Sequence, residues 1–158
     1  MNMNNNMKVL LIAMVALIAT SFKTSDEIKW MDFNKGYELA KKKNKIMLVD
    51  VYTDWCGWCK RMDKDAYAKP NIADLTNKDF VAIKFNPEIK GISYSFEGKT
   101  YTGEQLAGVI SNYQISGYPT TIFIYPKTKK SEVIVGYKNA EQMAGVLEDM
   151  KTKFYGKK

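Results

Sequence analysis

The hydrophobic and polar residues of this chain follow patterns that predict both helices and strands. Apolar residues spaced three or four positions apart predict amphipathic helices, whereas short and nearly continuous apolar runs predict buried strands. Helices are predicted at 32–43, 60–69, 70–76, 103–113 and 139–154. Strands are predicted at 46–52, 80–86, 120–125 and 132–136, and a small hairpin at 92–101.

The order of the predicted elements indicates the class of fold. A strand–helix–strand unit is followed by a helix, and then by two strands and a final helix. The strands at 120–125 and 132–136 are joined by a lysine-rich turn and should pair antiparallel. The sequence therefore predicts one α/β domain at 30–158, with a central mixed β-sheet flanked by helices.

The first residues differ from the rest of the chain. Lys8 precedes an apolar run at 9–19, and small residues follow at 19–21. These features are typical of a secretory signal, and the run is shorter than the roughly 20 residues of a membrane span. We therefore predict a signal peptide at 1–21 and a short linker at 22–29, with a buried N-terminal helix as the alternative. No cysteine follows the run directly, so a lipid anchor is not expected.

The charge of the chain is positive but scattered. The formal net charge is +7, and Arg61 is the only arginine among many lysines. A nucleic-acid-binding surface usually combines a basic stripe with arginine or aromatic partners, which this distribution does not provide. We therefore expect no nucleic-acid partner and only a weak preference for acidic surfaces.

Two cysteines, Cys56 and Cys59, are the main candidates for chemistry. A disulfide between residues only three apart would close almost no loop and would stabilise the fold little. Their position at the start of a helix directs backbone N–H groups toward the Cys56 sulfur and favours its thiolate. Cys59 lies one helical turn further on, where it can attack a mixed disulfide formed at Cys56. The spacing therefore predicts thiol–disulfide exchange, with Lys60 and Arg61 adding positive charge nearby.

A charged residue, Asp50, interrupts the apolar run at 46–52 just before the cysteines. A carboxyl group inside a buried strand can exchange protons with a neighbouring thiol, and burial should raise its pKa. The alternative is a structural acid that is hydrogen-bonded at the end of a strand.

Residues 49–60, which read VDVYTDWCGWCK, resemble the active-site segment of the thioredoxin family. Within them, YTDWC is similar to secreted thioredoxin-like proteins and to the C-terminal domain of the membrane reductant conductor DsbD. The resemblance extends from about Trp30 onward. It implies a thioredoxin fold, with the hairpin at 92–101 as an insertion before a cis-proline loop.

The resemblance also implies roles for individual residues. Asp50 matches the buried aspartate that helps to move the proton of the second cysteine, and Lys84 matches the lysine beside that aspartate. Tyr118-Pro119-Thr120 matches the loop whose cis-proline faces the disulfide. Gly136 matches a glycine near the substrate groove.

Substrate contacts are expected on both sides of the cysteines. The residues concerned are Trp55, Gly57, Trp58, Tyr118, Pro119 and Thr120. Simpler explanations exist for several of these positions. The tryptophans could be a hydrophobic cover, Pro119 an ordinary trans proline before a strand, and Lys84 a charge partner rather than a catalyst. The hairpin is either structural or a docking surface.

These features predict an exported thiol–disulfide oxidoreductase that acts on protein thiols and disulfides through Cys56 and Cys59, as a monomer with no cofactor and no metal. Gly57-Trp58 lacks the proline of ordinary thioredoxin and the histidine of strong oxidants, and the chain contains no histidine. We therefore expect a reductase, or a relay that receives electrons from a membrane donor of the DsbD type. The reference potentials are about −270 mV for thioredoxin and about −120 mV for DsbA.

Other functions use the same features differently. The chain could be a disulfide oxidase or isomerase, or a chaperone-like module that binds peptides without catalysis. Zinc normally takes four ligands, so metal binding would need a dimeric Cys₄ site. A peroxidase would need a peroxidatic cysteine with a distant resolving partner. The periplasm is the expected location, with full secretion or anchoring by an uncleaved signal as alternatives.

Overall fold

A computed structural model describes residues 27–156 of the chain. The predicted signal peptide at 1–21 and most of the predicted linker at 22–29 lie outside the described residues. Within 27–156, no helix combines the length and the apolar character needed to cross a membrane.

A four-stranded mixed sheet forms the centre of the domain. Its strands are β1 (Ile46–Val51), β2 (Phe80–Phe85), β5 (Thr120–Tyr125) and β6 (Lys130–Val135). They lie in the order β2-β1-β5-β6. β1 pairs with β2 in parallel, whereas β1–β5 and β5–β6 are antiparallel. The predicted mixed sheet is confirmed.

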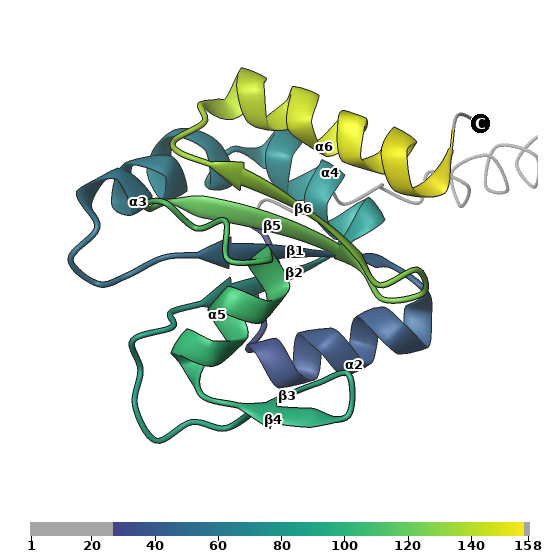
Figure 1. Cartoon of the computed structure of the whole chain (residues 1–158). Coiled ribbons are helices and arrows are strands. Elements are labelled where there is room, and N and C mark those ends of the chain that lie inside the picture. The colour runs from purple at the N-terminus through teal and green to yellow at the C-terminus, as the bar shows by residue number, and fades with distance from the viewer. Residues whose placement is uncertain (1–26, 157–158) are drawn as a thin grey trace, which may run out of the picture.

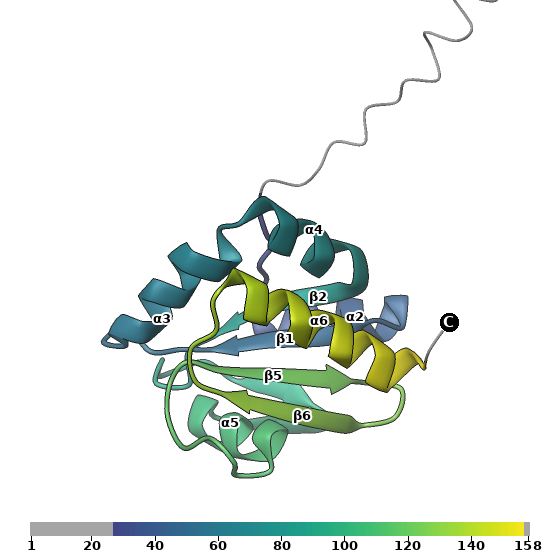
Figure 2. The same ribbon diagram turned by 90° about the horizontal axis from the view of Figure 1, so that it is seen from above.

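Helices cover both faces of the sheet (Figure 1). They are α2 (Phe33–Lys43), α3 (Gly57–Met62), the π-helix η1 (Asp63–Tyr67), α4 (Pro70–Asp79), α5 (Gly103–Ser111) and α6 (Ala140–Tyr155). Figure 2 shows α4 and α6 crossing one face, with α5 on the opposite one. A hairpin of β3 (Tyr94–Phe96) and β4 (Lys99–Tyr101) packs outside α2 and α5. The predicted α/β fold class is therefore confirmed.

β1 is buried at every position because its side chains alternate between the two faces of the sheet and helices cover both faces. Met47, Val49 and Val51 join the apolar cluster under α2 and α5, whereas Ile46 and Leu48 join the cluster under α4 and α6. Because successive strand residues face opposite sides of a sheet, Asp50 points to the same side as Ile46 and Leu48.

Most predicted elements are confirmed, with changes at their ends. The helix expected at 60–69 starts earlier, at Gly57, and changes to π-helical geometry at Asp63–Tyr67. The hairpin turns at Glu97 and Gly98, as expected, and both have positive φ angles, of 50° and 76°. The Tyr37 hydroxyl of α2 donates to the Glu97 carboxylate, so the hairpin is tied to the core.

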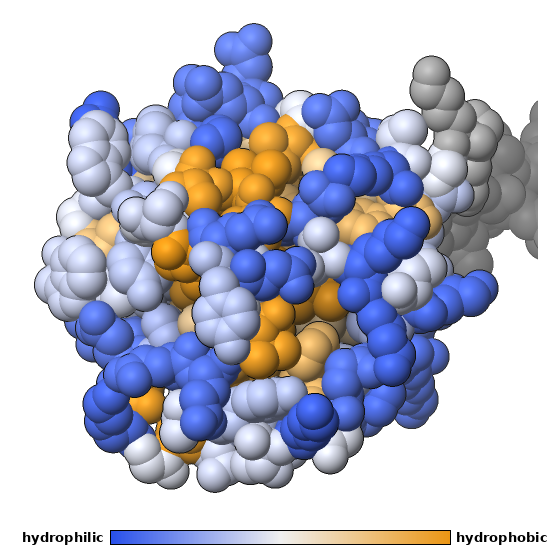
Figure 3. All heavy atoms as spheres, in the orientation of Figure 1, coloured by the Kyte–Doolittle hydropathy of each residue, from blue (hydrophilic) through white to orange (hydrophobic). Residues whose placement is uncertain are grey.

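The surface over the open edge strand β6 mixes apolar and hydrophilic side chains. Figure 3 shows apolar groups between α6 and α5 that are crossed by hydrophilic ones. Val133 and Ile134 of β6 are partly buried against the two clusters, while Lys153 forms an ion pair with Glu132 at 2.5 Å. Charged groups along an edge strand oppose pairing with another chain.

Gly103 provides a test of how tightly α5 packs against the chain that follows β2. A Cβ at this position would overlap the backbone carbonyl of Pro87, which cannot rotate away as a side chain can. Gly103→Ala should therefore lower the free energy of unfolding by about 1–3 kcal/mol.

The matched control is Gly145, in the middle of α6, where a Cβ would meet nothing within 4 Å. Gly145→Ala should raise the free energy of unfolding by about 0.5–1 kcal/mol, because alanine favours the helix. Urea unfolding of both variants measures the two changes. If the two substitutions changed the free energy of unfolding equally, the contact with Pro87 would not constrain α5.

Candidate functional site

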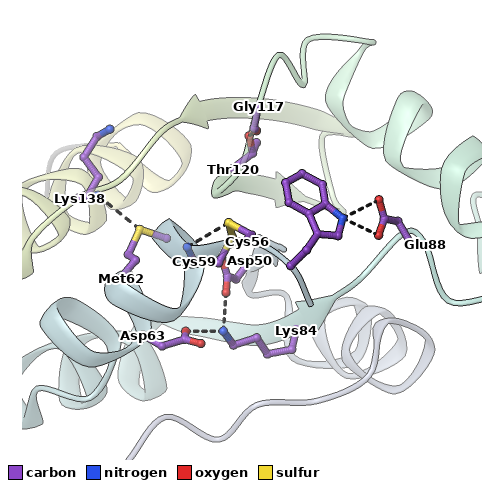
Figure 4. The surroundings of a disulfide bond; sticks show 11 residues. Asp50, Cys56, Cys59, Met62, Asp63, Lys84, Glu88, Gly117, Thr120 and Lys138 are labelled. Atoms are coloured by element: carbon purple, nitrogen blue, oxygen red, sulfur yellow. Dashed lines mark hydrogen bonds and ion pairs between the residues drawn. A yellow bond between two sulfur atoms is a disulfide. The ribbon is translucent and has the colours of Figure 1, made fainter. Parts of the chain in front are cut away.

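Cys56 and Cys59 form a disulfide where the chain leaves β1 and enters α3 (Figure 4). Cys56 is the N-cap of α3, and its Sγ accepts a hydrogen bond of 3.0 Å from the backbone N–H of Cys59. Both residues are only 4% exposed. The same N–H can stabilise a thiolate at Cys56 when the pair is reduced.

The π-helical turn after α3 brings two further side chains under the active-site end of the sheet. Asp63 forms an ion pair with Lys84 of β2, and the hydroxyl of the buried Tyr67 hydrogen-bonds to that of Thr121 at 3.1 Å. Such π-helical insertions occur frequently at functional sites because they redirect side chains within a helix.

Asp50 is buried, with 1% exposure, and its Oδ2 accepts a hydrogen bond of 2.6 Å from the Lys84 ammonium. The parallel register of β1 and β2 pairs the two residues directly. Asp50 Oδ1 has no hydrogen-bond partner within residues 27–156. Figure 4 shows the carboxylate close to the disulfide, with Lys84 and Asp63 below it in this view. One oxygen of Asp50 is therefore free to exchange a proton.

The charges around Asp50 act in opposite directions. Burial raises the pKa of Asp50 to about 6, the direction expected from the sequence, while the Lys84 ammonium lowers it. Burial also lowers the pKa of Lys84, but the Asp50 and Asp63 carboxylates outweigh that effect, so the pKa of Lys84 is raised. At neutral pH Asp50 is mainly ionised but easily protonated, which suits a proton acceptor.

The loop before β5 lies beside the disulfide. The Tyr118–Pro119 peptide bond is cis, and the Thr120 hydroxyl donates to the carbonyl of Gly117 at 2.6 Å. Gly136 donates its backbone N–H to the carbonyl of Pro119 at 2.8 Å. Because Thr120 pairs with Val51, the loop stands at the end of β1 from which the chain continues to Cys56.

The two tryptophans that flank the cysteines have different neighbours. Trp55 is 68% exposed, its ring meets that of Tyr118 edge-on at 5.8 Å, and its Nε1 donates to Glu88. Trp58 is 56% exposed and packs against Tyr137 at 5.5 Å, with the Arg61 guanidinium over its ring. Both therefore present large exposed faces beside the disulfide, while Gly57 between them is also exposed.

The structure thus places the residues that the sequence marked for the site around the disulfide, but the side chain of Thr120, expected to contact substrate, is fully buried. It adds two carboxylates that the sequence analysis missed, Asp63 and Glu88. Asp63 follows Cys59 by four residues, a spacing that places both on one helix face and could have been noticed. Glu88 lies in an irregular segment after β2, and no sequence signal connects it with Trp55.

A disulfide at a strand–helix junction, with a cis-proline loop at the same end of the sheet and a buried aspartate in the preceding strand, defines a protein of the thiol–disulfide oxidoreductase class. The model of the thioredoxin-like domain matches residues 33–151. The chain therefore belongs to the thioredoxin-like domain family. Within residues 27–156, no cluster of three or more histidine, cysteine, aspartate or glutamate side chains could hold a metal ion.

Known proteins agree with this assignment. The thiol:disulfide interchange protein DsbD of Salmonella typhi is 24% identical over 132 residues, which cover 82% of this chain and 20% of that protein. The chain spans a fifth or less of the length of the first curated relatives that it matches.

Two solved structures show the same fold. The oxidoreductase DsbH has a TM-score of 0.61 and 15% identity, covering 87% of this chain and 92% of its own. A candidate disulphide isomerase from Bacteroides thetaiotaomicron has a TM-score of 0.57 and 26% identity, covering 85% of this chain and 98% of its own.

The raised pKa of Asp50 predicts a specific pH dependence of stability. Because the folded state binds this proton more tightly than the unfolded chain, stability falls as the pH rises from about 4 to about 6 and then levels off. Asp50→Asn removes that fall, so the stability of the oxidised variant relative to the natural protein should increase as the pH rises from about 4 to about 6.

Urea unfolding of the variant and the natural protein between pH 4 and pH 8 measures the difference. The exposed Asp149 of α6 provides the control, since Asp149→Asn should leave the pH profile unchanged. The raised pKa of Asp50 would be contradicted if the difference in stability between Asp50→Asn and the natural protein did not vary with pH.

Proposed function

We propose that this protein reduces disulfides of other proteins outside the cytoplasm. The observation that carries the proposal is the Cys56–Cys59 pair at the start of α3, with Asp50 buried beside it. The predicted signal at 1–21 supports export, and the periplasm is the proposed location. The domain at 30–158 is proposed to act as a monomer.

The reaction begins with the reduced pair. The Cys56 thiolate attacks one sulfur of a substrate disulfide, forms a mixed disulfide and releases the other substrate sulfur as a thiolate. Cys59 then gives its proton to Asp50 and attacks the Cys56 sulfur. The Cys56–Cys59 disulfide forms, the second substrate sulfur leaves, and two electrons have passed to the substrate.

The surrounding residues support each step. The backbone N–H of Cys59 stabilises the Cys56 thiolate, and Lys84 keeps Asp50 ionised enough to accept a proton. Asp63 also pairs with the Lys84 ammonium, and its negative charge raises the pKa of Asp50. Trp55, Trp58 and the loop around Pro119 are proposed to contact the substrate polypeptide.

The proposed direction of electron flow depends on the residues between and around the two cysteines. Gly57-Trp58 brings no charged group to Cys56, and the whole chain contains no histidine to stabilise its thiolate further. A less stabilised thiolate favours the oxidised pair, which makes the dithiol a stronger reductant. The similarity to DsbD supports a donor of that type in the membrane.

The reduction potential of the Cys56–Cys59 pair tests the direction. Equilibration against defined redox buffers should give a value of about −250 mV or lower. A value of about −150 mV or higher would contradict a reductase. It would favour the isomerase function suggested by the similarity to the candidate disulphide isomerase of Bacteroides thetaiotaomicron.

A trapping variant tests the mechanism and the class of substrate. Cys59→Ser leaves the attacking thiol but removes the resolving one, so mixed disulfides with substrate proteins should accumulate on Cys56. Non-reducing electrophoresis and mass spectrometry after acid quenching identify them. Cys56→Ser is the control and should accumulate about tenfold less, because the backbone N–H that can stabilise a thiolate points at the Cys56 sulfur and not at that of Cys59. Equal trapping by both variants would contradict the assigned roles.

A further inference from the structure

A surface hollow of about 330 Å³ lies beside the active-site loop and has no part in the chemistry above. It is bounded by the segment after β2, by α5 and by the segment before the cis-proline. The side chains that matter are Glu88, Glu104, Tyr113, Ile115 and Tyr118. A space of this size lies at the lower end of the range for binding pockets and can hold one long side chain.

Direct contacts connect the hollow to Trp55, the residue that precedes Cys56. Tyr118 lines the hollow and immediately precedes the cis Pro119, and its ring meets that of Trp55. Glu88, on the opposite wall, accepts hydrogen bonds of 3.0 and 3.2 Å from the Trp55 indole. Figure 4 shows both bonds ending on the Glu88 carboxylate, to the side of the disulfide. A polypeptide whose sulfur reaches Cys56 therefore places neighbouring residues close to the hollow.

The ring of Tyr113 forms the outer wall of the hollow, and the backbone of this residue has a positive φ angle. Tyr113 is 83% exposed and has a φ of 60°, directly after Asn112 with a φ of 51°. Its ring lies against Gly108, where a Cβ would come within 2.6 Å of it. Left-handed non-glycine residues are costly and concentrate at functional sites. Here the two positive φ angles end α5, where the N–H groups of Asn112 and Tyr113 donate to the carbonyls of Val109 and Gly108, and they leave the Tyr113 ring exposed at the rim of the hollow.

The charge in the hollow is opposite to that of the whole protein. Glu88 and Glu104 face it, although the formal net charge is +7. Burial raises the pKa of Tyr118, and the negative charges of both glutamates raise it further, which indicates that they act on the same space. Lys90 pairs with Glu104 at 2.5 Å, but both side chains are largely exposed, and such pairs are weak. The hydrogen bonds that Glu88 accepts in the hollow come from the neutral Trp55 indole.

We propose that this hollow binds a lysine or arginine side chain that lies near the reactive cysteine of the substrate polypeptide. The carboxylates of Glu88 and Glu104 attract the cationic group, and the rings of Tyr113 and Tyr118 offer faces that favour cations. Ile115 contacts the methylene stem of the same side chain. The inference rests on the proposed function and adds to it a preference among protein substrates.

The test uses peptides that each carry one cysteine in a disulfide with a small thiol. Lysine, norleucine or glutamate stands at one position, which is scanned over four residues on either side of the cysteine. The rate constant of reduction by the reduced protein is measured for each peptide at low salt. At the best position, lysine should react about fivefold faster than glutamate, and the ratio should fall as salt is added.

Charge-removing variants locate the origin of this preference. In Glu88→Gln/Glu104→Gln the lysine-to-glutamate ratio should fall to near one. The control Glu38→Gln/Glu148→Gln removes the same charge from exposed positions on α2 and α6 and should keep the ratio. A preference that survives in the first variant, or disappears in the control, overturns the proposal.

A third variant separates binding in the hollow from a general electrostatic attraction. Tyr113→Ala should slow both the lysine and the norleucine peptide, and the lysine peptide more, by about threefold, because both lose the apolar contact with the ring and only lysine also loses the attraction of a cation to its face. Unchanged rates would show that no side chain enters the hollow. If the natural protein fails to reduce even the norleucine peptide, the proposed function fails. If it reduces that peptide but shows no lysine preference, only the present inference fails.

Discussion

The ion pair between Asp50 and Lys84 is the interaction on which the rest of the site depends. It exists because β1 and β2 pair in parallel with these two residues in register, so the sheet itself sets their distance. A carboxyl group with 1% exposure would be neutral at pH 7 without a nearby cation. Lys84 leaves it poised near pH 6, where it can take up a proton and release it again.

The opposing demands on Lys84 explain the arrangement around it. Its ammonium serves two carboxylates, Asp50 and Asp63, and lies 4.9 Å from the ring centre of Trp30 and 5.2 Å from that of Tyr52. Aromatic faces stabilise a cation without offering it a competing hydrogen-bond acceptor. The lysine therefore remains charged while partly withdrawn from water, and its field reaches Asp50 with little screening.

The fold and the centre of the site could be predicted from the sequence because their signals are local. Apolar runs mark the strands, and the spacing of Cys56 and Cys59 marks the chemistry. Asp50 stands out as a charge inside one of those runs. Asp63 and Glu88 escaped notice because ordinary surface positions are often acidic. The π-helical turn brings Asp63 to Lys84, and the course of the chain after β2 brings Glu88 to Trp55, and neither has a sequence pattern of its own.

The two sides of the disulfide differ in charge, although a single motif supplies both tryptophans. Trp55 is held by the Glu88 carboxylate, whereas Trp58 lies under the Arg61 guanidinium. An extended polypeptide that crosses the disulfide therefore meets a carboxylate on one side and, on the other, a guanidinium that is paired with Asp65. Because the net charge of the protein attracts acidic partners over long distances, only the local charges can set the orientation in which a partner binds. The asymmetry around Cys56 is thus the structural basis on which substrate choice can rest in an otherwise general reaction.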